Sequence, residues 1–162
     1  MLCLPLTTLA QLRKPYTKPI RWASTVELGG LSPILSLNAE YVPIQLEKSF
    51  LLIRGGIGQL FTGYSLLTVP HALTWNVILN GRTRGCPPKS PKNSFFAELG
   101  VGGVYLVGAT EDITYRWSPI LGVRRYFFYN PRATGFWKAQ LTPVVSVQLV
   151  PWGGIGIGLL ID

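Results

Sequence analysis

The chain has 162 residues, enough for one domain, and 48% of them are hydrophobic while only 14% are charged. This balance is more apolar than that of an ordinary soluble domain of the same size. No uninterrupted apolar run approaches the roughly 18 residues that a membrane helix requires, and the 18 glycines and 13 prolines disfavour helices in general.

The net charge of +8 does not indicate nucleic-acid binding, because the basic residues form no single stripe. Four of the fifteen precede the first expected strand and four lie in one connection, where charges are usually solvated. The four in the connection are the candidate contacts to a partner protein or an anionic lipid: Arg82, Arg84, Lys89 and Lys92.

The first 21 residues are expected to precede the folded domain. Residues 1–10 are apolar and end in a small residue, like the last part of a truncated secretory signal, but they lack its basic region. Residues 11–21 are basic and proline-containing, which predicts an extended N-terminal tail. The only two cysteines, Cys3 and Cys86, make neither a disulfide framework nor a metal site.

Eight segments alternate with a period of two between turn signals, which predicts an all-β fold. They span residues 22–28, 33–44, 49–60, 68–79, 94–106, 115–128, 136–147 and 151–161. The last segment places Ile155, Ile157, Leu159 and Ile161 on one face and Gly154, Gly156 and Gly158 on the other. Such a pattern is typical of a strand whose bulky face meets lipid while its other face lines a narrow lumen.

The alternation predicts an eight-stranded antiparallel up-and-down transmembrane β-barrel over residues 22–162, because a closed barrel satisfies every backbone hydrogen bond in lipid. Both termini and the basic connection of residues 80–93 are expected at one end, on the periplasmic side of an outer membrane. The connections around Gly29, Thr62 and Ala109, at the opposite end, are expected to be short.

Six charged residues fall on the polar faces of the expected strands and form a candidate lumen charge network: Glu27, Glu40, Arg54, Glu98, Arg124 and Lys138. A charge facing lipid at mid-bilayer costs about 2–4 kcal/mol, so each is more favourable in the lumen beside an opposite charge. Three acids balance three bases, and an eight-stranded barrel is narrow enough to be filled by side chains. A plugged interior is therefore expected.

Aromatic residues cluster near the predicted strand ends, as the interface girdles of a membrane barrel do. One girdle is expected from Trp22, Tyr41, Phe50, Phe95, Tyr126, Phe127, Phe128, Phe136 and Trp137. Trp117 and Trp152 are expected in the opposite girdle.

Catalytic and cofactor motifs are missing from the sequence. The single histidine, His71, is expected to face outward without a nucleophile beside it, and Glu111 and Asp112 are adjacent residues of a solvated turn. The glycine-rich segments match neither the dinucleotide fingerprint nor the phosphate loop. We expect no enzymatic activity, no cofactor and no metal.

Several short segments occur in an order and spacing that resemble a group of known proteins: VELGG (26–30), LSLNAEY (35–41), RGGIG (54–58), ELGVG (98–102), LGVR (121–124) and PWGGI (151–155). Over roughly residues 22–161 the chain resembles small outer-membrane β-barrel proteins of the Bacteroidetes-like type. The resemblance implies a fold and a location but no particular activity. The chain departs from the pattern at its end, Leu160-Ile161-Asp162, where such barrels usually carry an aromatic residue.

Three functional hypotheses follow. The first is an integral outer-membrane barrel with a structural or partner-interaction role, as a subunit of an envelope complex. The second is a narrow channel or small-ligand carrier, which requires a continuous wet lumen. The third is a soluble, lipocalin-like barrel that binds an apolar ligand, but outward pairs such as Leu35 and Leu37 oppose the polar outer face it requires.

Overall fold

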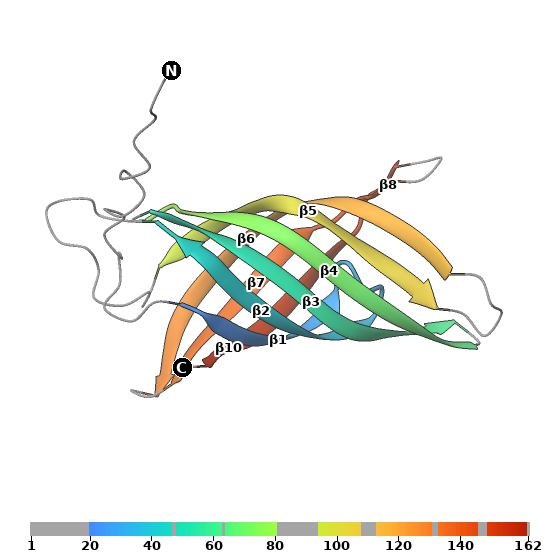
Figure 1. The fold of residues 1–162 in the computed structure, drawn as a ribbon, viewed down its shortest axis with the longest axis horizontal. Coiled ribbons are helices and arrows are strands. Elements are labelled where there is room, and N and C mark those ends of the chain that lie inside the picture. Colours follow the sequence, from blue (N-terminus) through green and yellow to red (C-terminus); the bar gives the residue numbers. More distant parts are fainter. Residues whose placement is uncertain are drawn as a thin grey trace, which may run out of the picture.

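The computed structural model describes residues 20–46, 48–62, 64–80, 94–107, 113–130, 133–145 and 149–161. Eight strands close into one antiparallel barrel in which each strand pairs with its neighbours in the chain, and the last pairs with the first (Figure 1). These strands are β1 (Trp22–Gly29), β2 (Leu35–Gln45), β3 (Ser49–Thr62), β4 (Tyr64–Ile78), β5 (Phe95–Val107), β6 (Ile113–Asn130), β7 (Ala133–Leu141) and β10 (Gly153–Ile161). The predicted all-β, eight-stranded antiparallel barrel is confirmed.

Within these described ranges, no helix has the length and apolarity needed to cross a membrane.

The chain enters and leaves the barrel at the same end. Trp22, at the start of β1, is opposite Ile161, at the end of β10, and the connection from β4 to β5 leaves from that end as well. Figure 1 shows the start of β1 and the end of β10 on that side, while β8 projects from the opposite side. The expected signal segment, residues 1–10, and all but the last two residues of the expected tail, residues 11–21, lie outside the described ranges.

The expected strand over residues 136–147 is wrong in its second half. The barrel strand β7 ends at Leu141, and β8 (Val144–Val145) and β9 (Leu149–Val150) form a separate two-stranded sheet before β10 begins. Pro143 and Pro151 flank this small sheet, and proline cannot donate a backbone hydrogen bond to a ladder. The fourth strand also begins earlier than expected, at Tyr64.

Side chains alternate between the outer face and the lumen along most of each strand. On β2, Leu35 and Leu37 are exposed whereas Ser36 and Asn38 are buried. On β10, Ile155 and Ile157 are 62% and 63% exposed while glycines occupy the inward positions. The barrel is thus apolar outside and polar inside, the reverse of the usual arrangement in a soluble domain.

Four aromatic rings close the lumen at the end that holds the termini. This aromatic plug consists of Phe50, Phe96, Tyr126 and Phe136, each no more than 1% exposed. The ring centroids of Phe50 and Phe96 are 5.2 Å apart, and those of Phe96 and Tyr126 are 5.7 Å apart, both edge to face. Ile20, Ala23, Val42 and Leu52 complete the same buried cluster.

The expected girdle is therefore wrong for Phe50, Tyr126 and Phe136, which point inward. Tyr126 and Phe136 each lie two residues from an inward charge, and a period of two places both on the lumen face. Trp22 and Tyr41 remain outside, with ring centroids 4.6 Å apart. Of the other residues expected in the girdles, Phe95, Phe127 and Trp137 face outward at this end and Trp117 faces outward at the other. Trp152 is 40% exposed in the connection before β10, and the side chain of Phe128 lies outside the described set.

The turn between β1 and β2 folds into the opposite mouth of the barrel. Gly29 and Gly30 adopt φ angles of 72° and 79°, in the left-handed region that favours glycine. This turn directs Leu31 into the lumen, where it packs with Ala72 and Ile120. The hydroxyl of the buried Ser32 forms a hydrogen bond of 2.8 Å with the hydroxyl of Thr68.

A methyl group at Gly30 is expected to destabilise the barrel. Its Cβ would overlap the carboxylate of Glu27 and the amide of Gln140, in addition to the backbone strain at φ 79°. We expect Gly30→Ala to lower the free energy of unfolding by at least about 2 kcal/mol. The matched control is Gly55→Ala, because a Cβ there meets no atom within 4 Å. Urea unfolding followed by tryptophan fluorescence measures both, and equal stabilities would contradict this account of the turn.

Candidate functional site

The six charged residues expected in the lumen lie together in its middle, between the aromatic plug and the β1–β2 turn. All six are between 0% and 2% exposed. They project from six different strands: Glu27 from β1, Glu40 from β2, Arg54 from β3, Glu98 from β5, Arg124 from β6 and Lys138 from β7. We call this group the lumen charge ring.

Each arginine of the ring bridges two carboxylates. Arg54 approaches Glu27 at 2.8 Å and Glu98 at 3.4 Å. Arg124 approaches Glu98 at 3.7 Å and Glu40 at 2.7 Å, with a second hydrogen bond to Glu40 at 3.1 Å. The two oxygens of Glu40 therefore accept from both ends of one guanidinium, the strongest geometry for such a pair.

Lys138 closes the ring. Its ammonium lies 2.9 Å from Glu27 and 3.3 Å from Glu40. Acid and base thus alternate around a complete cycle, and every charge has two partners of the opposite sign. Buried ions are tolerated when neighbouring opposite charges compensate them in this way.

The ring crosses the lumen instead of following the barrel wall. Arg124 and Lys138 are directly opposite each other on the adjacent strands β6 and β7, where two like charges repel. Glu40 contacts both of them from β2, which is not adjacent to either strand. Its carboxylate therefore offsets a repulsion that the sheet register creates.

Glycine on β10 leaves the space that the long side chains need. The strand contributes no charge, and Gly154, Gly156 and Gly158 occupy its inward positions. A Cβ at Gly156 would lie 3.0 Å from Cε of Lys138, so the lysine stem passes over this glycine to reach Glu27. The small inward residues of β10 thus leave room for the charged side chain of Lys138 on the adjacent strand β7.

Three uncharged side chains complete the site, and sequence patterning did not assign them this role. Gln140 donates to Glu27 and accepts from Arg54 at 3.1 Å. The Arg124 guanidinium lies 4.4 Å from the centroid of the Phe136 ring and 3.4 Å from the Tyr126 hydroxyl. The sequence does carry a signal for two of them. Tyr126 lies two residues from Arg124 and Phe136 lies two residues from Lys138, so each shares the lumen face with a charge of the ring.

The ring has the chemistry of a structural closure. Its charges balance, and every carboxylate is engaged by a cation at 3.4 Å or less. No group of three or more metal-ligating side chains occurs among the described residues. His71 faces outward, where its Nε2 lies 3.3 Å from the hydroxyl of Tyr115, and it is not part of the ring.

The second candidate site, Arg82, Arg84, Lys89 and Lys92, lies outside the described residues. The connection that contains these residues joins β4 to β5 at the end of the barrel that holds both termini. Comparison of the chain with protein-family models and with curated proteins finds no match.

Removing one charge from the ring is expected to cost more than removing a balanced pair. Lys138→Met leaves Glu27 and Glu40 each short of one partner, and breaking a buried ion pair in this way costs about 3–5 kcal/mol. Adding Glu27→Gln restores neutrality, so the double variant should be more stable than the sum of the single losses by at least about 1 kcal/mol.

Chemical unfolding of the two single variants and the double variant measures this coupling. Lys48→Met is the control, because this lysine is exposed in the turn between β2 and β3; its effect is expected to stay within about 0.5 kcal/mol. Strictly additive losses would show that the charges do not act as one network.

Proposed function

We propose that the protein is an integral outer-membrane β-barrel with a closed lumen and a structural or partner-binding role. One observation carries the proposal: the outer face of the barrel is apolar while the lumen holds the charges. A barrel in lipid requires this inversion, because apolar outward side chains match the hydrocarbon and polar groups are favourable only inside.

The outer surface supports this setting along several strands. Its outward positions carry large exposed aliphatic residues, including Leu37, Ile57, Leu99, Val101, Leu121, Ile155 and Ile157. Exposed aromatic residues flank this apolar belt, with Trp22 and Tyr41 near one end and Trp117 and Trp152 near the other. Such rings favour the interface between headgroups and hydrocarbon.

The lumen favours a structural role over transport. The aromatic plug closes one end, the turn at Leu31 closes the other, and the lumen charge ring fills the middle. A lipocalin-like carrier uses its interior to hold an apolar ligand, whereas the centre of this lumen is filled by ion pairs. These contacts support a barrel that neither conducts nor carries ligand through its centre.

We further propose that the end with the termini faces the periplasm and contacts a partner with an acidic surface, as in an envelope complex. Arg21, Lys48 and Arg125 are exposed at this end. All the acidic residues among the described residues belong to the buried ring. The described surface there is therefore basic, like the neighbouring connection that carries Arg82, Arg84, Lys89 and Lys92.

A charge on the outer belt tests the membrane setting. Ile157 and Ile161 lie on the same face of β10 with similar exposure, 63% and 56%, but Ile161 is at the strand end. In a bilayer, Ile157→Arg should cost about 2–4 kcal/mol and Ile161→Arg about 0–1 kcal/mol. The readout is the fraction of protein in the detergent-extracted membrane that migrates faster on a gel before boiling than after it.

For the membrane barrel, we expect the wild type to show this heat-modifiable band, Ile161→Arg to retain it and Ile157→Arg to lose most of it. If the wild type is instead recovered in the soluble fraction and both variants behave alike, the soluble ligand-binding barrel replaces the proposal.

Conductance separates the structural role from the channel. In planar bilayers, the wild type is expected to give no unitary current steps, because buried side chains fill the ring and both closures. A narrow channel would conduct, and its conductance would change in Arg54→Gln, which removes a lumen charge. A closed barrel should lose stability in this variant without acquiring the regular steps of a pore.

A further inference from the structure

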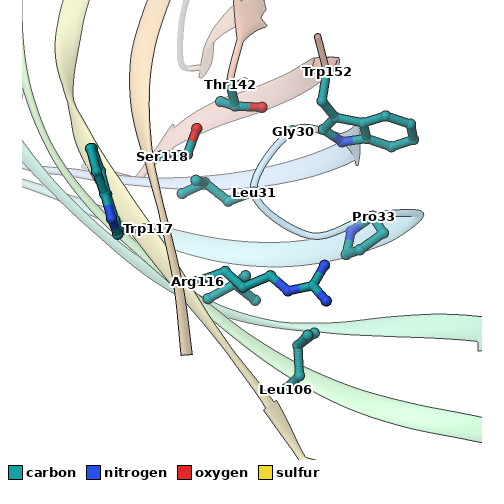
Figure 2. Close-up of a pocket in the computed structure, with 10 residues that line it drawn as sticks. Gly30, Leu31, Pro33, Leu106, Arg116, Trp117, Ser118, Thr142 and Trp152 are labelled. Atoms are coloured by element: carbon teal, nitrogen blue, oxygen red, sulfur yellow. The ribbon is translucent and has the colours of Figure 1, made fainter. Parts of the chain in front are cut away.

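A cavity of about 180 Å³ lies at the barrel end opposite the termini, beyond Leu31 and therefore separate from the lumen charge ring. The β1–β2 turn, β5, β6 and the connection from β7 to β10 form its walls (Figure 2). The lining residues that bear on its chemistry are Leu31, Leu106, Arg116, Ser118, Thr142 and Trp152. We call it the mouth cavity.

We propose that the mouth cavity binds a small organic anion whose apolar body is about the size of one aromatic ring. The size follows from the volume, since an apolar cavity of about 150 Å³ holds one benzene molecule. The apolar character follows from the lining residues Leu31, Leu106 and Trp152, whose side chains are apolar. Convergent apolar walls with few polar groups are typical of ligand sites.

The single cation of the cavity determines the charge of the ligand. Arg116 is exposed, and Figure 2 shows its guanidinium on the side of Pro33. The acids of the described residues, Glu27, Glu40 and Glu98, are all engaged in the ring. None of them pairs with Arg116, so its guanidinium is available to a carboxylate, which it binds through two parallel hydrogen bonds.

A buried hydroxyl marks the other side of the cavity. Thr142 is 1% exposed, and its Oγ1 has no hydrogen-bond partner among the described residues. The hydroxyl of Ser118 is different, because it donates to the carbonyl of Pro143 at 2.8 Å. Figure 2 shows Thr142 and Trp152 across the cavity from Arg116 and Leu106. A ligand with an acid group at one end and a hydroxyl at the other satisfies both sides.

Three probes of one shape separate these contributions: 4-hydroxybenzoate, benzoate and phenol. Ligand-observed NMR titration of the full chain in neutral detergent, with empty micelles as the blank, gives their affinities. We expect 4-hydroxybenzoate to bind about tenfold more tightly than either probe that lacks one group. Arg116→Gln should remove its advantage over phenol, and Thr142→Val should remove its advantage over benzoate.

The matched control is Arg125→Gln, because this arginine is exposed on the same strand, β6, toward the other end of the barrel. It should leave all three affinities unchanged. A heat-modifiable band equal to that of the wild type shows that each variant is folded. The proposal is overturned if no probe binds, or if the three bind equally and neither Arg116→Gln nor Thr142→Val alters the result in folded protein.

Discussion

The closed cycle of alternating charges in the lumen is the constraint on which the rest of the structure depends. Each of its six members contacts two opposite charges, so no side chain can leave without weakening two others. The contact between Glu27 and Lys138 joins β1 to β7 across β10, the strand that closes the barrel. The ring therefore spans the strand at which the sheet closes.

The barrel wall accommodates this ring by varying side-chain size from strand to strand. Where β7 contributes Lys138, its neighbour β10 places Gly156 directly opposite. Gly56 on β3 similarly faces the side chain of Asn38 on β2, and a Cβ there would overlap the amide. Interior positions of a narrow barrel are filled to a fixed total volume, so large residues on one strand require small ones on the next.

The two ends of the barrel differ because different elements close them. Aromatic rings from the strands themselves form the plug near the termini, beside a basic surface. At the other end, a glycine turn carries Leu31 inward, and the connection from β7 to β10 rises above it. This second arrangement leaves a recess, since a turn and a loop cover the mouth less completely than packed rings do. The mouth cavity is a consequence of that difference.

The sequence by itself determined which residues face the lumen, because the direction of a side chain in a strand depends only on its parity. Eight alternating segments with balanced inward charges therefore predicted the barrel and all six residues of the ring. The same parity places Tyr126 and Phe136 on the lumen face, but their aromatic character favoured the prediction that they belong to the outer girdle. The tertiary structure alone decided which charges pair, that Arg124 lies against Phe136, that Leu31 enters the mouth and that the ladder stops before Pro143. Each of these depends on register and closure, which bring together strands that are distant in the chain.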